Sequence, residues 1–164
     1  MNLELTVQDL YQPSTVDEST WVEWFQSWLQ TPGLTLPPAD TYELSLRLTT
    51  DTEIQALNAQ FRHQDKSTDV LSFAAMEVDF PEIEPEPGNL SLYLGDIIIS
   101  VDTAVRQAPE HGYALTKELA WLASHGLLHL LGWDHPDEQS LLIMLDRQET
   151  FLAQSGLWIL LPNK

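Results

Sequence analysis

The sequence predicts an α/β (α+β) fold, in which one sheet of about four strands packs against about five helices in a single domain, residues 1–164. Two patterns predict the elements: segments that are apolar at alternate positions or throughout, as strands are, and segments with apolar residues at three- and four-residue steps, as helices have. The third observation is the length of 164 residues with 43% hydrophobic and 20% charged residues, which is typical of one globular domain. No repeat or internal domain boundary appears.

The N-terminal part alternates two strands with two helices. Residues 3–7 and 42–48 alternate apolar and polar side chains, which indicates half-buried strands. One helix is expected over about 18–30, before Pro32-Gly33, and a second through about residue 61, capped by Thr50 or Asp51. The inward-facing apolar residues expected on these helices are Trp21, Trp24, Phe25, Trp28, Leu29, Ile54, Leu57 and Phe61.

Two further strands are expected in the middle of the chain. Residues 70–73 form a short β-prone segment, and residues 90–100, with three consecutive isoleucines, form the most apolar strand candidate. Between them, residues 77–88 are rich in acids and prolines, which predicts an extended, solvated loop.

The C-terminal part is expected to be helical. A short helix follows residue 101 to about 107, a longer one runs over about 113–131 before Gly132, and a last helix runs from Pro136 to Gly156. The apolar residues that recur at helical spacing in the last helix are Leu141, Leu142, Leu145 and Leu152.

Composition limits the function classes. The absence of cysteine excludes disulfides and thiolate metal sites, so any metal must bind nitrogen and oxygen ligands. A formal charge of −18, from 25 acids against 7 bases, argues against a broad basic surface for nucleic acid. No apolar run approaches the ~18 residues of a membrane span, and the N-terminus resembles no secretory signal, so a cytoplasmic location is expected.

One segment carries a metal-ligand pattern. His125 and His129 are four residues apart in a predicted helix, so both imidazoles project from one face. Gly132 lets the chain leave the helix in a conformation that other residues resist, and His135 can then fold back towards the same ion. Three nitrogen ligands with an open fourth position are typical of catalytic zinc, so one Zn²⁺ per chain is expected.

Chance is a poor explanation of this spacing. With 5 histidines in 164 residues, a given histidine has a second one four positions later and a third six positions after that in about one case in a thousand by chance. His63 and His111 show no such spacing and are interpreted as surface residues. Asp134 is expected either to orient a ligating imidazole or to cap the following helix.

The same spacing occurs in metzincin proteases, but the glutamate that should follow the first histidine is Gly126 here. That glutamate is the general base of such a peptidase, so its absence argues against peptide hydrolysis. Met144 lies in a predicted helix, where it is interpreted as a core residue rather than as part of a methionine turn.

Three motifs together resemble the YbeY family of bacterial and organellar endoribonucleases. They are the histidine segment 125–135, the segment 57–73 that ends in Thr-Asp-Val-Leu-Ser-Phe, and Leu-Gly-Asp-Ile at 94–97. Ala74 departs from the family, whose members often have proline there, and the first ~40 residues carry little of the resemblance.

The resemblance implies a zinc-dependent, single-strand-specific endoribonuclease that acts in 3′-end maturation of small-subunit (16S) ribosomal RNA and in ribosome quality control. It also implies that Arg62 is the active-site arginine, whose planar fork suits a phosphate. Asp69, Ser72 and Asp96 are expected to frame the cleft: the first two bracing backbone, Asp96 closing a turn.

Two alternatives stay open: a metallopeptidase-like hydrolase, and a ribosome-assembly binding factor whose metal is structural. The open fourth position argues against a structural metal. The −18 charge keeps the assembly factor open as an alternative, because acidic proteins usually reach RNA-rich particles through protein partners or a small basic patch such as Arg62 and Lys66. The expected partners are therefore single-stranded or ribosomal RNA and ribosomal or assembly-factor proteins, with neither DNA nor a membrane.

Overall fold

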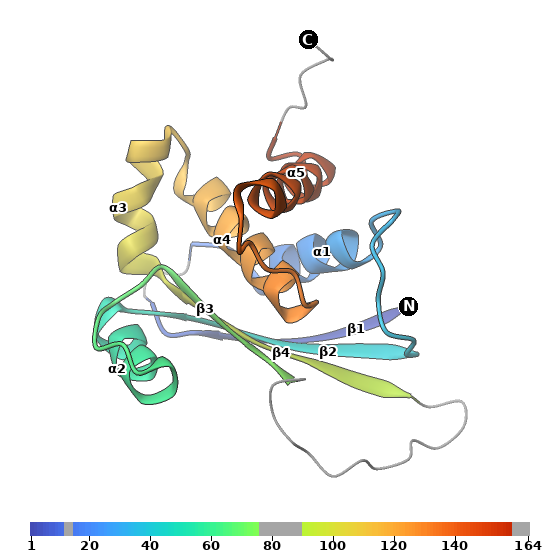
Figure 1. Ribbon diagram of the computed structural model, residues 1–164, viewed down its shortest axis with the longest axis horizontal. Coiled ribbons are helices and arrows are strands. Elements are labelled where there is room, and N and C mark those ends of the chain that lie inside the picture. Colours follow the sequence, from blue (N-terminus) through green and yellow to red (C-terminus); the bar gives the residue numbers. More distant parts are fainter. Residues whose placement is uncertain (12–14, 76–89, 159–164) are drawn as a thin grey trace.

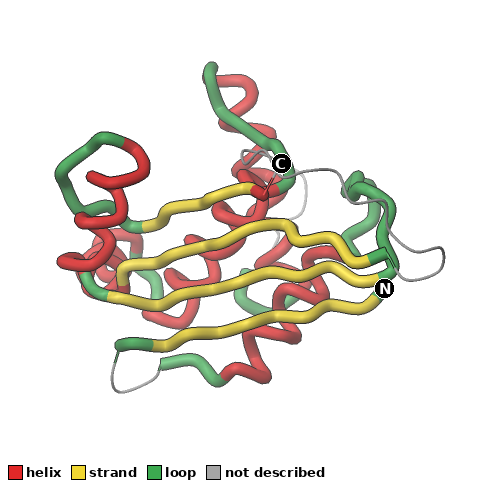
Figure 2. The backbone as a smooth tube through the Cα atoms, turned by 90° about the horizontal axis from the view of Figure 1, so that it is seen from below, coloured by secondary structure: helices red, strands yellow, loops and turns green. Residues whose placement is uncertain are grey.

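The protein contains a four-stranded sheet. The computed structural model describes residues 1–11, 15–75 and 90–158. The strand order is β1-β2-β4-β3; β1, β2 and β4 are parallel, and β3 is antiparallel to β4 at the edge. Figure 2 shows the four strands side by side. Their bounds are β1 Asn2–Asp9, β2 Thr41–Thr49, β3 Val70–Ala74 and β4 Ser91–Ser100.

The described residues form five helices besides this sheet, so the predicted fold class is confirmed. Most of them lie over one face, with α4 directly against the sheet and α5 outside it, and α2 lies alone on the opposite face (Figure 1). The helices are α1 Glu18–Leu29, α2 Asp51–Arg62, α3 Val101–His111, α4 Leu115–Leu130 and α5 Glu138–Gln154. As expected, Thr50 caps α2: its side chain accepts a hydrogen bond from the Glu53 N–H.

The apolar run of β4 follows from its place inside the sheet. Ile97 and Ile99 are fully buried in the main core, under α4 and its neighbours. Ile98 points to the other face, where it packs with Ile54 of α2 and Leu71 of β3. Helices therefore cover this part of β4 on both faces, which is why its apolar residues are consecutive rather than alternating.

Two glycines let α4 approach the sheet closely. A Cβ atom on Gly126 would lie 2.9 Å from Ile97 Cγ2 and 3.0 Å from Ser72 Oγ, so any side chain there would push α4 away from the strands. Gly95, at φ 142°, lies at a register irregularity of β4 beside the backbone of Phe73 and the side chain of Leu130. The Gly-Asp-Ile segment thus serves helix–sheet packing at this point.

The structure differs from the prediction at the end of one helix and in the exposure of one aromatic residue. Helix α3 extends past residue 107 to His111, because the helix continues through Pro109 until Gly112 ends it in a left-handed conformation. Phe61 is 53% exposed rather than inward, since α2 is a single layer on its face. The Phe73 ring packs beside it, with ring centroids 5.4 Å apart.

Of the four leucines expected at helical spacing in the last helix, Leu152 is fully buried and two others are exposed. Leu141 and Leu142 are exposed, because α5 forms an outer layer and only one stripe of it meets α4 and α1. Met144 belongs to that buried stripe, as predicted. The predicted acidic loop lies outside the described residues.

Candidate metal centre

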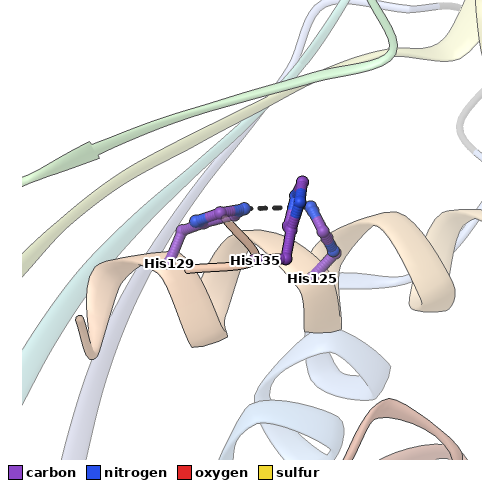
Figure 3. A group of neighbouring side chains, drawn as sticks. All are labelled: His125, His129 and His135. Carbon is purple, nitrogen blue, oxygen red and sulfur yellow. Dashed lines mark hydrogen bonds between the residues drawn. The ribbon is translucent and has the colours of Figure 1, made fainter. Parts of the chain in front are cut away.

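The three histidines predicted from the sequence lie together. His125 and His129 project from one side of α4 with their Nε2 atoms 3.0 Å apart, and the ring of His135 lies beside them (Figure 3). One nitrogen from each residue falls within 4.8 Å of the other two. The sequence separation of four and then six residues therefore becomes a compact cluster of three imidazoles.

The turn after α4 returns the third histidine to the first two. The Gly132 N–H donates to the His129 carbonyl at 3.0 Å, and the Trp133 N–H donates to the Leu128 carbonyl at 2.9 Å. This is the hydrogen-bond pattern of a Schellman motif, and Gly132 holds the left-handed position with φ 93°. The predicted role of Gly132 is confirmed.

Burial keeps the imidazoles available as ligands. Burial lowers the pKa of His125, and His135 lowers it further. The hydrogen bond that His125 donates to Gln148 and the charge of Asp69 partly oppose this shift. Burial, followed by the nearness of the other two imidazoles, also lowers the pKa of His129. Both rings are therefore neutral at neutral pH, which is the form that binds a metal.

A residue that the sequence analysis missed orients the first imidazole. Gln148 of α5 is fully buried, and its Oε1 lies 3.2 Å from His125 Nδ1 while its Nε2 donates to the Trp121 carbonyl at 3.2 Å. Accepting from Nδ1–H fixes the tautomer that leaves Nε2 free to face His129. The sequence does hold a sign of this role: Gln148 is a polar residue at helical spacing from Met144, Phe151 and Leu152, which form the buried side of α5.

The donor set fits one zinc ion. Tetrahedral zinc with Zn–N distances near 2.0 Å holds its nitrogens about 3.3 Å apart, and the 3.0 Å between His125 and His129 is close to that value. The ligand nitrogen of the exposed His135 lies within 4.8 Å of the other two, so it has to approach them for tetrahedral coordination. Three neutral nitrogen ligands without a thiolate suit zinc better than magnesium or calcium, which prefer oxygen.

The cluster lies in a cleft that also contains the predicted arginine. The cleft has a volume of about 710 Å³, and Arg62, His125 and His129 are among the residues that line it. Arg62 Nη2 donates to the Ser72 carbonyl at 2.6 Å, and its Cζ atom lies 4.9 Å from the centre of the Phe73 ring. These contacts hold the guanidinium at the cleft wall.

Of the three residues expected to frame the cleft, two have the predicted role and one does not. As predicted, Asp69 and Ser72 brace backbone: Asp69 accepts from the Val70 N–H at 2.8 Å, and Ser72 Oγ donates to the Gly126 carbonyl at 3.2 Å. Asp96 does not close a turn, because it lies within β4 and accepts from Tyr93 Oη.

Asp134 caps no helix. Asp137 is the N-cap of α5, and its carboxylate accepts from the Ser140 N–H at 2.8 Å. The Asp134 carboxylate accepts instead from the His135 N–H at 2.8 Å, so it braces the backbone of the metal-site turn rather than an imidazole. His63 and His111 are both exposed, as predicted, and His111 Nδ1 also lies 2.9 Å from the buried carboxylate of Glu118.

Comparison with known proteins gives consistent matches. A family model described as Endoribonuclease YbeY matches residues 6–156. A protein named Endoribonuclease YbeY from Nostoc sp. (strain PCC 7120) is 56% identical over 147 residues, 90% of this chain and 79% of its own. Its namesake from Cyanothece sp. (strain PCC 7425) is 52% identical over 161 residues, 96% of this chain and 95% of its own. The solution structure of TM1509 from Thermotoga maritima has the same fold, with a TM-score of 0.59, 24% identity and coverage of 93% and 89%.

Proposed function

The chain belongs to the YbeY family of endoribonucleases, and we propose that it cuts single-stranded RNA with one zinc ion bound by His125, His129 and His135. We propose further that the cell uses this activity in the cytoplasm, in maturation of the 3′ end of 16S ribosomal RNA and in ribosome quality control. The observation that carries the proposal is the presence of the histidine cluster and Arg62 in one cleft.

The residues divide the chemistry between them. A zinc ion on the three imidazoles would supply Lewis-acid activation of water and of a phosphoryl oxygen. Arg62, held by Ser72 and Phe73, offers its guanidinium to the phosphodiester and stabilises the charge that grows on the equatorial oxygens. Gln148 keeps His125 in the ligating tautomer.

Packing at Gly126 argues against a peptidase. The missing glutamate would have to project from this position, where a Cβ atom already meets Ile97 and Ser72. A longer side chain would enter the sheet rather than the cleft, so this fold does not place a general base after the first histidine. The activation of water therefore has to come from the metal site itself.

The acidic surface is the observation that supports a second candidate function, a ribosome-assembly factor with a structural metal. Of the seven Lys and Arg residues, Arg47 is paired with Glu53 and Arg106 with Asp51, which reduces the positive charge available to RNA. Among the described residues no helix is long and apolar enough to cross a membrane, and we propose RNA and ribosomal or assembly-factor proteins as the partners rather than DNA or a lipid bilayer.

Elemental analysis of the purified protein, together with cleavage of a labelled single-stranded RNA with and without chelator, tests both candidates. We expect His129→Ala to lose metal and cleavage, and Arg62→Glu to keep the metal while kcat falls by at least about 10²-fold, as for loss of one charge-stabilising donor. Cleavage by His129→Ala protein at the wild-type rate would rule out a catalytic metal. Zinc at full occupancy without any cleavage would favour the assembly factor.

A further inference from the structure

A stripe of four side chains runs along α4 towards the histidine cluster. Lys117, Trp121, His125 and His129 follow one another at four-residue steps, so each lies about one helical turn from the next along one side of the helix. The last two belong to the candidate metal centre. The first two have no part in the metal chemistry.

Trp121 forms part of the wall of the cleft. It lines the cleft together with His125, and it is half-buried. The Trp158 ring stacks on it with centroids 5.4 Å apart and planes 19° apart, and Gln148 donates to its carbonyl. The indole is therefore held in place beside the metal ligands while part of its surface faces the cleft.

Lys117 is positioned by aromatic rings. Its Nζ lies 4.2 Å from the centre of the Tyr113 ring and 4.3 Å from that of Trp158. No ion pair of Lys117 with a carboxylate occurs among the residues that the structure describes, in contrast to Arg47 and Arg106. Rings hold the ammonium without neutralising it, so it keeps its charge for an anion.

We propose that Trp121 and Lys117 form an RNA-binding subsite that extends the cleft along α4, with a base stacked on Trp121 and a backbone phosphate bound by Lys117. The inference rests on the proposed endoribonuclease function. Single-stranded RNA is recognised by such pairs, since an aromatic ring accepts any base and a cation accepts the backbone. Lys117 lies about 12 Å along the helix axis from His125, which corresponds to about three nucleotides of a stacked strand.

This subsite also accounts for RNA binding by a chain of charge −18. A cation that no described carboxylate neutralises, here Lys117, supplies local attraction along the substrate path where the overall field is repulsive. Arg62 lies at the cleft wall and Lys117 beyond the end of the cleft, on the far side of Trp121 from the metal centre.

The test compares zinc-loaded wild-type protein with Trp121→Leu, Trp121→Phe and Lys117→Gln on a labelled single-stranded RNA of about ten nucleotides. Thr52→Glu is the matched control: it makes the same change of one charge unit at an exposed first-turn position of α2, ten residues from Arg62 in the sequence. KM, kcat, the dependence of KM on salt, zinc content and Tm are measured for each protein.

We expect Trp121→Leu to raise KM by about 5- to 150-fold, the range for loss of one stacked base, with kcat and zinc content little changed and with Trp121→Phe close to wild type. Lys117→Gln should raise KM and reduce the slope of log KM against log salt by about 0.7, the value for one phosphate contact on a single strand. Thr52→Glu should leave the salt slope unchanged.

Two failures are distinguishable. If the wild-type protein does not cleave RNA, the proposed function itself fails. If the wild type cleaves but Trp121→Leu and Lys117→Gln keep its KM and salt slope, or lose activity only in proportion to a fall in Tm, the two residues merely anchor the chain after α5 and the subsite does not exist.

Discussion

Gln148→Leu tests how far the centre depends on a residue that does not bind the metal. The substitution keeps a side chain of similar volume but removes the oxygen that accepts from His125 Nδ1. The imidazole can then adopt either tautomer and turn. Loss of such a supporting partner typically weakens metal binding by about 10- to 100-fold, which corresponds to about 1.4–2.7 kcal/mol.

The metal-free protein should lose stability only through the hydrogen bonds of Gln148. The Trp121 carbonyl, one of the groups that Gln148 contacts, keeps a hydrogen bond from Ser124 Oγ at 2.8 Å. The Gln148 side chain also contacts His125 and Ser124, so the free energy of unfolding without metal should fall by about 1–3 kcal/mol, the cost of leaving a buried polar group unsatisfied. The contrast between metal-bound and metal-free protein isolates the effect on the metal site.

Competition with a chromophoric chelator gives the zinc Kd, and thermal unfolding with and without saturating zinc gives the linked stability. At the same free zinc, a Kd raised by 10- to 100-fold removes about 1.4–2.7 kcal/mol of stabilisation, or about 3–10 °C in Tm for a chain of this size. Gln154→Leu, an exposed glutamine of the same helix that bonds Thr31, is the control and should keep the wild-type Kd. A wild-type Kd for Gln148→Leu would refute the reasoning.

Three further outcomes are expected. Gly126→Ala should lower the free energy of unfolding by up to about 2 kcal/mol in urea unfolding, because overpacking against Ile97 outweighs the better helix propensity of alanine, and a gain in stability would contradict the close packing. Metal-free protein should lose stability as pH falls from about 7 through 6.5 and further through the lowered pKa values of His125 and His129, since the unfolded chain takes up protons more readily. Tm should therefore fall less on acidification in His125→Asn, and an equal fall would count against it. Thr50→Ala should cost about 1 kcal/mol in the same urea titration by removing the α2 cap, whereas an unchanged midpoint would mean that water replaces it.

The histidine spacing and Gly132 determined much of the candidate site in advance, because they act over eleven consecutive residues. A four-residue step on a helix and a left-handed glycine turn are local geometry, which the chain carries wherever the helix packs. Whether a segment forms a strand or a helix was equally predictable. A half-buried strand has apolar residues at every second position, and a half-buried helix has them about every 3.6 residues. Phe61 was misjudged because an apolar residue does not by itself show whether a second layer covers it, and the exposure of Leu141 and Leu142 was unpredictable for the same reason.

The amino-acid sequence by itself determined the elements, the three imidazoles and the absence of a glutamate after the first of them. Only the tertiary structure decided that Arg62 of α2 meets the same cleft as α4, that Gln148 of α5 orients His125, and that Gly126 lies against Ile97. These three relations join residues that are far apart in the chain. Their geometry depends on how the helices pack on the sheet, which no local pattern specifies.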